Sequence, residues 1–338
     1  MESIITRTLK LNIMKKFYLL LLSCLIPALT TYAQNKPIPR DTTYTPYQVY
    51  QQNKTKFPQA SIAYPHLPEG VKAFENMVYA TLHNTPYGER DLHLDLFKPD
   101  KPGKFPLLVM IHGGGWRSGN KSMQVPMAQR IASKGFVTVA VEYQLSLEAQ
   151  YPAAVYNIKS AIRWLKANAE KYGIDTSRVA ISGCSAGGQL AALIGMTNGI
   201  SKFEGTQGVT GFSSHVNAVI DIDGVLDFLA PSSLNLVRKP NSADISWFGG
   251  SFTEKPETWK EASAIFYVNP KSVPVLFINS GFSRFHSGQD EMIGMMKEYN
   301  IYTEVHKFDI QLHPFWLLNP WMEPTTDYMV DFLKRILK

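Results

Sequence analysis

One turn constrains this chain more than any other feature. Residues 178–182 form a short apolar run that indicates a buried strand, and residues 186–193 are small or leucine-rich, as is typical of a buried helix. Between them lies Gly183-Cys184-Ser185-Ala186-Gly187, where glycine on each side removes the Cβ atoms that would collide in so sharp a reversal. The pattern predicts that Ser185 projects from the carboxyl end of a strand as a nucleophile. The alternative is a tight connection in which Ser185 only caps the helix.

A second apolar strand leads into a run of glycines. Residues 105–111 predict a buried strand, which continues into His112-Gly113-Gly114-Gly115-Trp116. Taken alone, such a loop could cradle a phosphate or simply turn the chain. Bare backbone N–H groups are also what an oxyanion hole requires, because they stabilise negative charge on an attacked carbonyl oxygen. We therefore expect Gly113 and Gly114 to form this hole together with Ala186.

These two motifs, in this order, resemble those of a known fold family. With the sequence Tyr143-Gln-Leu-Ser that precedes a predicted helix, the chain from about residue 71 onward resembles an α/β-hydrolase of the carboxylesterase, acetylxylan-esterase and hormone-sensitive-lipase-like group. The resemblance implies a mostly parallel central sheet, helices on both of its faces, and serine esterase chemistry. A metal or cofactor is not expected, since no His, Cys or carboxylate cluster has ligand spacing.

The rest of the chain alternates strands with helices, which is the pattern of a mostly parallel sheet covered on both faces. Further strands are expected at 136–143, 216–222, 273–280 and 302–308, helices at 123–133, 153–172, 290–299 and 325–337, and a hairpin from 71–83 and 91–98. The rhythm breaks at residues 230–267. We expect this insertion to cover the substrate as a lid, with an ordinary surface insertion as the alternative.

The N-terminus predicts export. Lys15 and Lys16 precede a short apolar stretch and a small-residue cleavage site after Ala33, which is the pattern of a signal peptide spanning residues 1–33 with Met14 as the start. The mature protein would be periplasmic or secreted, with no integral membrane segment, because the apolar stretch is too short to span a bilayer. The alternative is a lipoprotein anchored at Cys24. Residues 34–67 are expected to form an arm packed on a catalytic domain of residues 68–338.

Composition narrows the classes of partner. The formal net charge is +6, but Lys and Arg are scattered and form no stripe, so a nucleic-acid partner is not expected. After removal of the signal peptide only Cys184 remains, so no intramolecular disulfide is available. We expect Cys184 to be a small buried neighbour of the nucleophile rather than a reactive thiol.

The general base should follow the serine in the chain. Downstream of Ser185 lie His215, His286, His306 and His313. His215 precedes a predicted strand and His306 lies inside one. His313 lies in a loop just after the last predicted strand, where this fold places its base, so we expect His313 to take the proton from Ser185.

The triad acid is less well defined. Proteins of the group most often carry it shortly after the strand that corresponds to residues 273–280, but there this chain has Arg284. Asp223 ends the preceding strand and is favoured, because a strand end fixes the carboxylate. Asp290, at the start of the next helix, is the alternative acid, although it could equally be a carboxylate near the helix dipole. Asp227 and Asp309 are weaker candidates.

The expected substrate rests mainly on resemblance. The segments around Arg284, His286 and Trp316 resemble those of exported bacterial carbohydrate esterases that act on pectin or xylan. Arg284 could pair with a uronic-acid carboxylate, or form a structural ion pair with Asp290 or a lid carboxylate. Trp116 and Trp316 could stack on a sugar or simply pack in the core. We expect removal of acetyl or methyl esters from a polysaccharide, pectin ahead of xylan; the alternatives are a general short-chain carboxylesterase and an inactive binding protein of this fold.

Overall fold

The computed structural model describes residues 36–338, and the helices and strands given below belong to one compact unit, Pro37–Lys338. The expected signal peptide and Cys24 lie outside these residues. Within residues 36–338, no helix combines the length and the apolar character needed to cross a bilayer.

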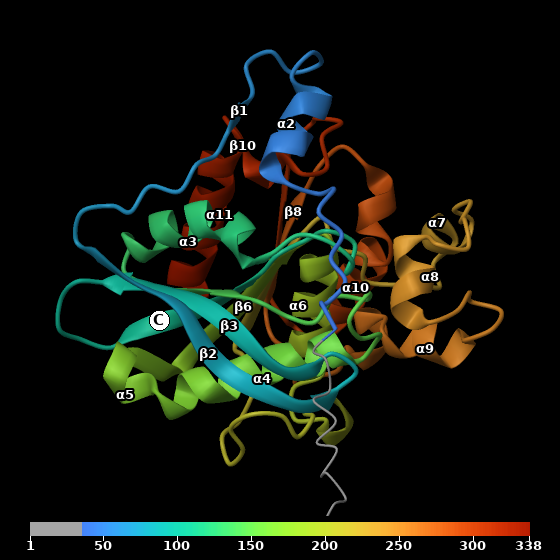
Figure 1. The fold of residues 1–338 in the computed structure, drawn as a ribbon. Coiled ribbons are helices and arrows are strands. Elements are labelled where there is room, and N and C mark those ends of the chain that lie inside the picture. Colours follow the sequence, from blue (N-terminus) through green and yellow to red (C-terminus); the bar gives the residue numbers. More distant parts are fainter. Residues whose placement is uncertain (1–35) are drawn as a thin grey trace, which may run out of the picture. The chain divides into compact units, whose positions relative to one another are not determined.

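An eight-stranded sheet forms the centre of this unit, in the order β2-β3-β5-β4-β6-β7-β8-β9 (Figure 1). The strands β2 and β3 form the expected antiparallel hairpin, β3 pairs antiparallel with β5, and all the other pairs are parallel. The bounds are β2 (Val71–Thr85), β3 (Gly88–Pro99), β4 (Phe105–Ile111), β5 (Val137–Val141), β6 (Ile174–Cys184), β7 (Ala218–Ile222), β8 (Val275–Asn279) and β9 (Thr303–Lys307). The prediction of a mostly parallel sheet is confirmed.

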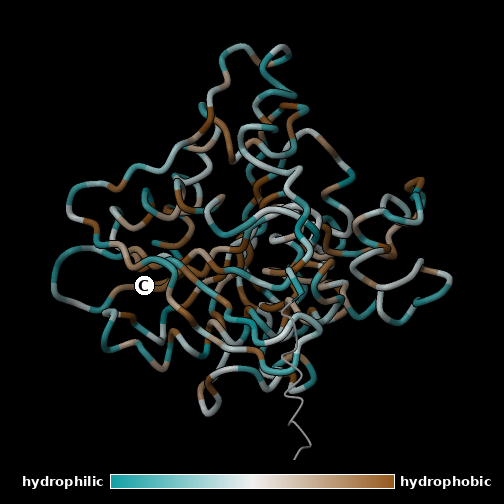
Figure 2. The backbone as a smooth tube through the Cα atoms, viewed as in Figure 1, coloured by the Kyte–Doolittle hydropathy of each residue, from teal (hydrophilic) through white to brown (hydrophobic). Residues whose placement is uncertain are grey.

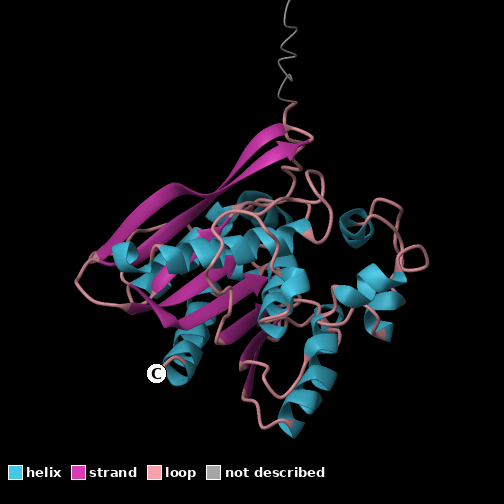
Figure 3. Ribbon diagram, turned by 90° about the horizontal axis from the view of Figure 1, so that it is seen from below, coloured by secondary structure: helices cyan, strands magenta, loops and turns pink. Residues whose placement is uncertain are grey.

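Helices cover both faces of this sheet (Figure 3). One face carries α4 (Ala153–Ala167), α6 (Ala186–Met196) and α10 (Gln289–Glu298), and the other carries α3 (Val125–Ala132), preceded by the short 3-10 helix η1 (Lys121–Gln124), and α11 (Met322–Ile336). In β4, Leu107 and Val109 point into one core, while Leu108 and Met110 point into the other. A strand buried on both faces has to be apolar at every position, which explains the continuous hydrophobic runs in the sequence.

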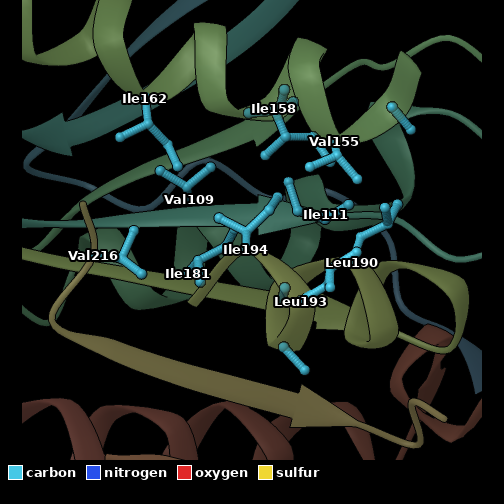
Figure 4. Packing of buried hydrophobic residues seen from close by; sticks show 14 of the residues in the cluster. Val109, Ile111, Val155, Ile158, Ile162, Ile181, Leu190, Leu193, Ile194 and Val216 are labelled. Atoms are coloured by element: carbon cyan, nitrogen blue, oxygen red, sulfur yellow. The ribbon is translucent and has the colours of Figure 1, made fainter. Parts of the chain in front are cut away.

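The larger core lies between β4, β6 and the helices α4 and α6. Val155, Ile158 and Ile162 line one side of α4 and face Val109 of β4 and Ile194 of α6 (Figure 4). Hydrophobic residues are concentrated along these central segments, whereas the outer loops are mostly hydrophilic (Figure 2). Removing this apolar surface from water contributes about 25 cal/mol per Å² and fixes the helices on the sheet.

The expected helix over residues 153–172 is two helices. It breaks at Asn168, after which α5 (Ala169–Tyr172) runs for one turn and ends at Gly173, whose φ is 67°. The Asn168 side-chain amide donates to the Trp164 carbonyl oxygen at 2.8 Å. Asparagine competes in this way with the helix backbone, so the break lies at the residue that interrupts the apolar pattern.

The N-terminal arm has more regular structure than its sequence suggested. It contains α2 (Pro46–Asn53), capped by the Thr45 side chain, and β1 (Ser61–Ile62), which pairs antiparallel with β10 (Leu318–Asn319). Phe57 packs edge-on against Trp321, with 5.4 Å between the ring centroids. The second half of the arm is therefore held by contacts to residues 318–321.

The insertion between β7 and β8 consists of short helices, drawn in orange in Figure 1: α7 (Pro231–Leu234), α8 (Ala243–Phe248), α9 (Pro256–Glu261) and the 3-10 helix η3 (Ala264–Tyr267). Between α7 and α8, Leu236 and Val237 are exposed apolar side chains, and Val237 is 101% exposed. The insertion lies where a lid would lie; its closure over a substrate stays a prediction.

Helix α6 approaches the sheet so closely at Gly195 that a side chain there would have to displace a neighbour. A Cβ atom on Gly195 would lie 2.1 Å from Cγ2 of Val219 in β7, whereas a Cβ atom on the helical Gly294 of α10 would meet nothing within 4 Å. We expect Gly195→Ala to lower the free energy of unfolding by about 1–3 kcal/mol through overpacking. Gly294→Ala should raise it by about 0.5–1 kcal/mol, because alanine favours the helix. Denaturant unfolding of both variants provides the measurement; a harmless Gly195→Ala would show that α6 does not rest on Val219.

Candidate active site

The turn between β6 and α6 holds Ser185 in an unusual backbone conformation, with φ 55° and ψ −120°. Its N–H donates to the Ile222 carbonyl oxygen at 2.7 Å. A Cβ atom on Gly183 would lie 1.9 Å from the Gly187 carbonyl oxygen, and one on Gly187 would lie 2.3 Å from the Ile111 carbonyl oxygen. Both glycines are therefore required by close backbone approach, as the sequence predicted.

A histidine from the other end of the chain meets this serine. His313 lies in the loop after β9, and its Nε2 atom is 2.8 Å from Oγ of Ser185. The Nδ1 atom of the same ring is 2.8 Å from Oδ2 of Asp223. The structure thus brings together a hydroxyl, an imidazole and a carboxylate in the geometry of a Ser-His-Asp triad.

The carboxylate comes from the end of β7. Asp223 has φ 52°, and its side chain is completely buried. Its second oxygen, Oδ1, accepts the Ser280 N–H at 2.7 Å and lies 3.3 Å from Nε2 of His286. Every oxygen of this buried carboxylate therefore faces a nitrogen donor, as a buried charge requires.

The other candidate acids lie elsewhere. Asp290 is exposed on the first turn of α10, and Asp309 is exposed after β9. Asp227 accepts the N–H of Leu229 at 2.8 Å and closes a local turn. Among residues 36–338, Asp223 is the carboxylate that contacts His313, so the structure favours the first of the two alternatives that the sequence left open.

The surroundings shift the pKa values of both Asp223 and His313. Burial alone would raise the pKa of Asp223, but hydrogen bonds from His286, His313 and Ser280 outweigh it and hold this pKa below its usual value. Burial lowers the pKa of His313; the Asp223 carboxylate opposes this shift, and the positive charge of Arg284 adds to it. At neutral pH the site therefore holds an ionised carboxylate and a neutral imidazole, which is the state a general base needs.

The glycine loop after β4 lies directly beside the nucleophile. Gly114, at φ 119°, and Gly115, at φ 59°, line the cavity next to Ser185 and Ala186. Within the described chain, the N–H groups of Gly114, Gly115 and Ala186 have no backbone acceptor. Gly113 instead packs against the turn, where a Cβ atom would lie 2.7 Å from the Cys184 carbonyl oxygen. The loop thus offers unpaired donors at the serine, with Gly115 added to the predicted residues, whereas Gly113 does not line the cavity but lies against Ser185.

A cavity of about 480 Å³ opens in front of the serine. Of the four residues predicted to contact substrate, Trp116 and Arg284 line this cavity, whereas His286 and Trp316 do not. Trp316 is only 2% exposed and packs edge-on against the His313 ring, with 5.1 Å between the centroids. His286 is held at the Asp223 carboxylate instead. Their sequence settings could not show whether these rings face the cavity or the interior.

Arg284 lies on the 3-10 helix η4 (Ser283–His286) at the cavity wall. Its guanidinium lies over the Phe285 ring, 4.2 Å from the centroid, and Phe285 stacks on the His313 ring at 3.4 Å. None of the ion pairs among residues 36–338 includes Arg284, so the expected structural pairing with Asp290 or a lid carboxylate is absent there. The cation is available to a ligand in the cavity.

Several lining residues were not predicted from the sequence. Tyr44 of the N-terminal arm lines the cavity, as do Phe228, Leu236 and the ion-paired Arg238 and Asp244 of the insertion. Pro46 at the start of α2 is a helix-start signal, but it says nothing about which side chain of the arm would reach the serine. Whether such residues line the cavity depends on how distant segments pack together, which the local sequence does not show.

Two further observations concern metal-ligating side chains and the free thiol. Among the described residues, no group of three or more His, Cys, Asp or Glu side chains is arranged to hold a metal ion. Cys184 is completely buried beneath the turn, and burial raises the pKa of its thiol. It has no access to the cavity and acts there as a small apolar side chain.

Comparison with known proteins identifies the family. The sequence profile of BD-FAE matches residues 94–302. The chain belongs to the BD-FAE family. The match includes Ser185 and Asp223 and ends before His313, so the base of this BD-FAE protein comes from the following segment.

Curated and solved proteins also resemble this chain. Esterase LipC of Mycobacterium tuberculosis is 30% identical over 182 residues, which cover 54% of this chain and 44% of the relative. The structure of a bifunctional GH43-CE protein of Bacteroides eggerthii has a TM-score of 0.67 at 25% identity, covering 79% of this chain and 38% of that one. A truncated carbohydrate esterase from gut microbiota superimposes with a TM-score of 0.69 at 23% identity, covering 80% of this chain and 99% of that one, and shares the fold. The chain spans about half the length of the curated relatives that it matches.

The charge of Arg284 should be measurable at His313. Because Arg284 lowers the pKa of His313, Arg284→Gln should move the titration of this imidazole to higher pH, toward the ordinary histidine value. Nitrogen NMR of ¹⁵N-histidine-labelled protein follows the ring directly. Arg178→Gln, in which the lost cation pairs with Asp175, is the control and should leave His313 unchanged. A wild-type midpoint above about 6.5 would contradict the assigned environment.

Proposed function

We propose that this protein is a serine-dependent carboxylic-ester hydrolase. The observation that carries the proposal is the continuous relay from Ser185 through His313 to Asp223, with 2.8 Å at each step. The named esterases among its relatives support the same reaction class. An inactive binding protein of this fold would have no reason to keep the three groups in register beside unpaired backbone donors.

The proposed reaction has two steps. His313 accepts the Ser185 proton as Oγ attacks the ester carbonyl, and the Asp223 carboxylate stabilises the imidazolium that forms. The N–H groups of Gly114, Gly115 and Ala186 are the donors for the oxyanion; one such donor is typically worth about 3–4 kcal/mol in the transition state. The protonated His313 then delivers its proton to the leaving alcohol. In the second step water attacks the acyl-enzyme while His313 accepts a proton from this water, and His313 returns the proton to Oγ of Ser185 as the acid leaves.

The cavity wall supports a proposal for the substrate class. We infer an acetyl or methyl ester on a plant cell-wall polysaccharide, pectin ahead of xylan. Support comes from Arg284, a cation on the cavity with no carboxylate partner among the described residues, and from the carbohydrate esterase that shares this fold. A uronic-acid carboxylate would complete the guanidinium with paired hydrogen bonds. Apolar lining by Val225, Phe228 and Leu236 supports the second candidate, a short-chain carboxylesterase.

We also propose that the protein is exported, periplasmic or secreted. The charged and apolar segments before Ala33 support this proposal. Mass spectrometry of the protein from its native host should find Gln34 at the N-terminus; a lipid-modified Cys24 would replace this interpretation with an anchored form.

The triad makes a graded prediction for hydrolysis of 4-nitrophenyl acetate. Ser185→Ala and His313→Ala should each lower kcat by several orders of magnitude without unfolding the protein. Asp223→Asn should lower kcat about 10³- to 10⁴-fold with little change in KM, because the amide favours the wrong imidazole tautomer. The matched control is Asp290→Asn, which changes an exposed carboxylate outside the relay and should have little effect. Equal losses in the two Asn variants would contradict the assigned acid.

Arg284 makes a separate prediction about substrate. If the guanidinium pairs with a uronic-acid carboxylate, Arg284→Gln should raise KM about tenfold or more for an esterified oligogalacturonide. KM for 4-nitrophenyl acetate should hardly change, because this ester offers no carboxylate to pair. Release of acetate and methanol from pectin and acetylxylan would be measured alongside. A similar loss on both substrates would assign Arg284 a role in the site itself and remove the support for pectin.

A further inference from the structure

The triad carboxylate has two histidine neighbours. Nδ1 of His313 is 2.8 Å from Oδ2 of Asp223, and Nε2 of His286 is 3.3 Å from Oδ1. An ionised carboxylate only accepts hydrogen bonds, so the second contact requires a proton on Nε2 of His286. At 3.3 Å the bond is long, but it joins a charged oxygen that is shielded from solvent.

The donors on Oδ1 limit rotation of the carboxylate. The N–H of Ser280 approaches this oxygen at 2.7 Å from the end of β8, and His286 approaches it from η4. A carboxylate held at one oxygen by two donors from different segments cannot turn freely about its Cβ–Cγ bond. The other oxygen, Oδ2, is then kept facing His313.

The backbone beside His286 is firmly attached. Ser287 accepts the N–H groups of Leu226 and Asp227 at 3.0 Å each through its carbonyl oxygen. Its hydroxyl donates to the Arg284 carbonyl oxygen at 3.0 Å and lies 2.8 Å from the Ser232 hydroxyl. These bonds tie η4 to the segment that follows Asp223, so the imidazole and the carboxylate are fixed to the same local framework.

We propose that His286 is a positioning residue that holds the Asp223 carboxylate in register with His313. It does not line the cavity and it contacts no reacting atom, so it acts through Asp223. The proposal rests on the proposed function, because positioning matters only if His313 works as a base. It gives His286 a role different from the substrate contact that its sequence setting suggested.

The test compares two variants of similar size. His286→Leu removes the donor, whereas His286→Gln keeps an amide N–H at the end of its side chain. For hydrolysis of 4-nitrophenyl acetate, the Leu variant should lower kcat about tenfold with KM unchanged, as expected for loss of one hydrogen bond to a charged group. The Gln variant should retain most of the activity. Thermal unfolding of each variant is measured in parallel.

The matched control is His306→Leu. His306 also contacts a carboxylate through Nε2, at 2.7 Å from Oε1 of Glu304 in β9, but it does not line the cavity. The variant His306→Leu should leave kcat unchanged. If His286→Leu also leaves kcat unchanged, or if Leu and Gln lower it equally, the positioning role is overturned.

A double-variant cycle separates positioning from general damage. In the Asp223→Ala background, His286→Leu should cause no further loss, because the carboxylate through which it acts has been removed. If the losses in kcat caused by the two substitutions add instead, the proposal is overturned, even where His286→Leu is partly destabilised. Failure of the proposed function gives a different result: the wild-type protein would show no hydrolysis that depends on Ser185.

Discussion

The backbone of Ser185 is the constraint on which the site depends. A residue other than glycine at φ 55° is strained by about 1–3 kcal/mol and persists only where its surroundings determine it. Here β6 is paired on both sides, and the Ser185 N–H is bound by the end of β7. The absence of Cβ atoms at Gly183 and Gly187 lets α6 start immediately. The same close approach extends to Gly113, so the nucleophile and the unpaired N–H groups are positioned by one packing arrangement.

The position of the acid shapes the rest of the site. Asp223 follows β7, the strand next to the nucleophile strand, and the region after β8 carries η4 instead of a carboxylate. Each of three consecutive residues of η4 meets the site differently: Arg284 faces the cavity, Phe285 covers the His313 ring, and His286 contacts Asp223. Because the carboxylate follows β7, the segment after β8 can carry the cation Arg284 close to His313. This cation lowers the pKa of His313.

Much of this arrangement could be predicted because buried strands leave continuous apolar runs and because the turn around Ser185 admits few sequences. His313 could be predicted from chain order. The choice between Asp223 and Asp290 could not be made from order alone, since each lies next to a regular element. The 2.8 Å distance between Nδ1 of His313 and Oδ2 of Asp223 decides between the two carboxylates. Trp316 shows the other limit: an aromatic residue in a loop carries no sign of whether it faces substrate or, as here, the interior.

The N-terminal arm belongs to the site as well as to the fold. Asp41 pairs with Arg117, just beyond the glycine loop, at 3.1 Å, and Tyr44, three residues further along the arm, lines the cavity. The arm lies outside the residues that the BD-FAE family matches, whereas Ser185 and Asp223 lie inside them. The cavity wall therefore draws on a segment outside the family match as well as on segments inside it. A substitution at Tyr44 would reshape the cavity without touching the relay from Ser185 through His313 to Asp223.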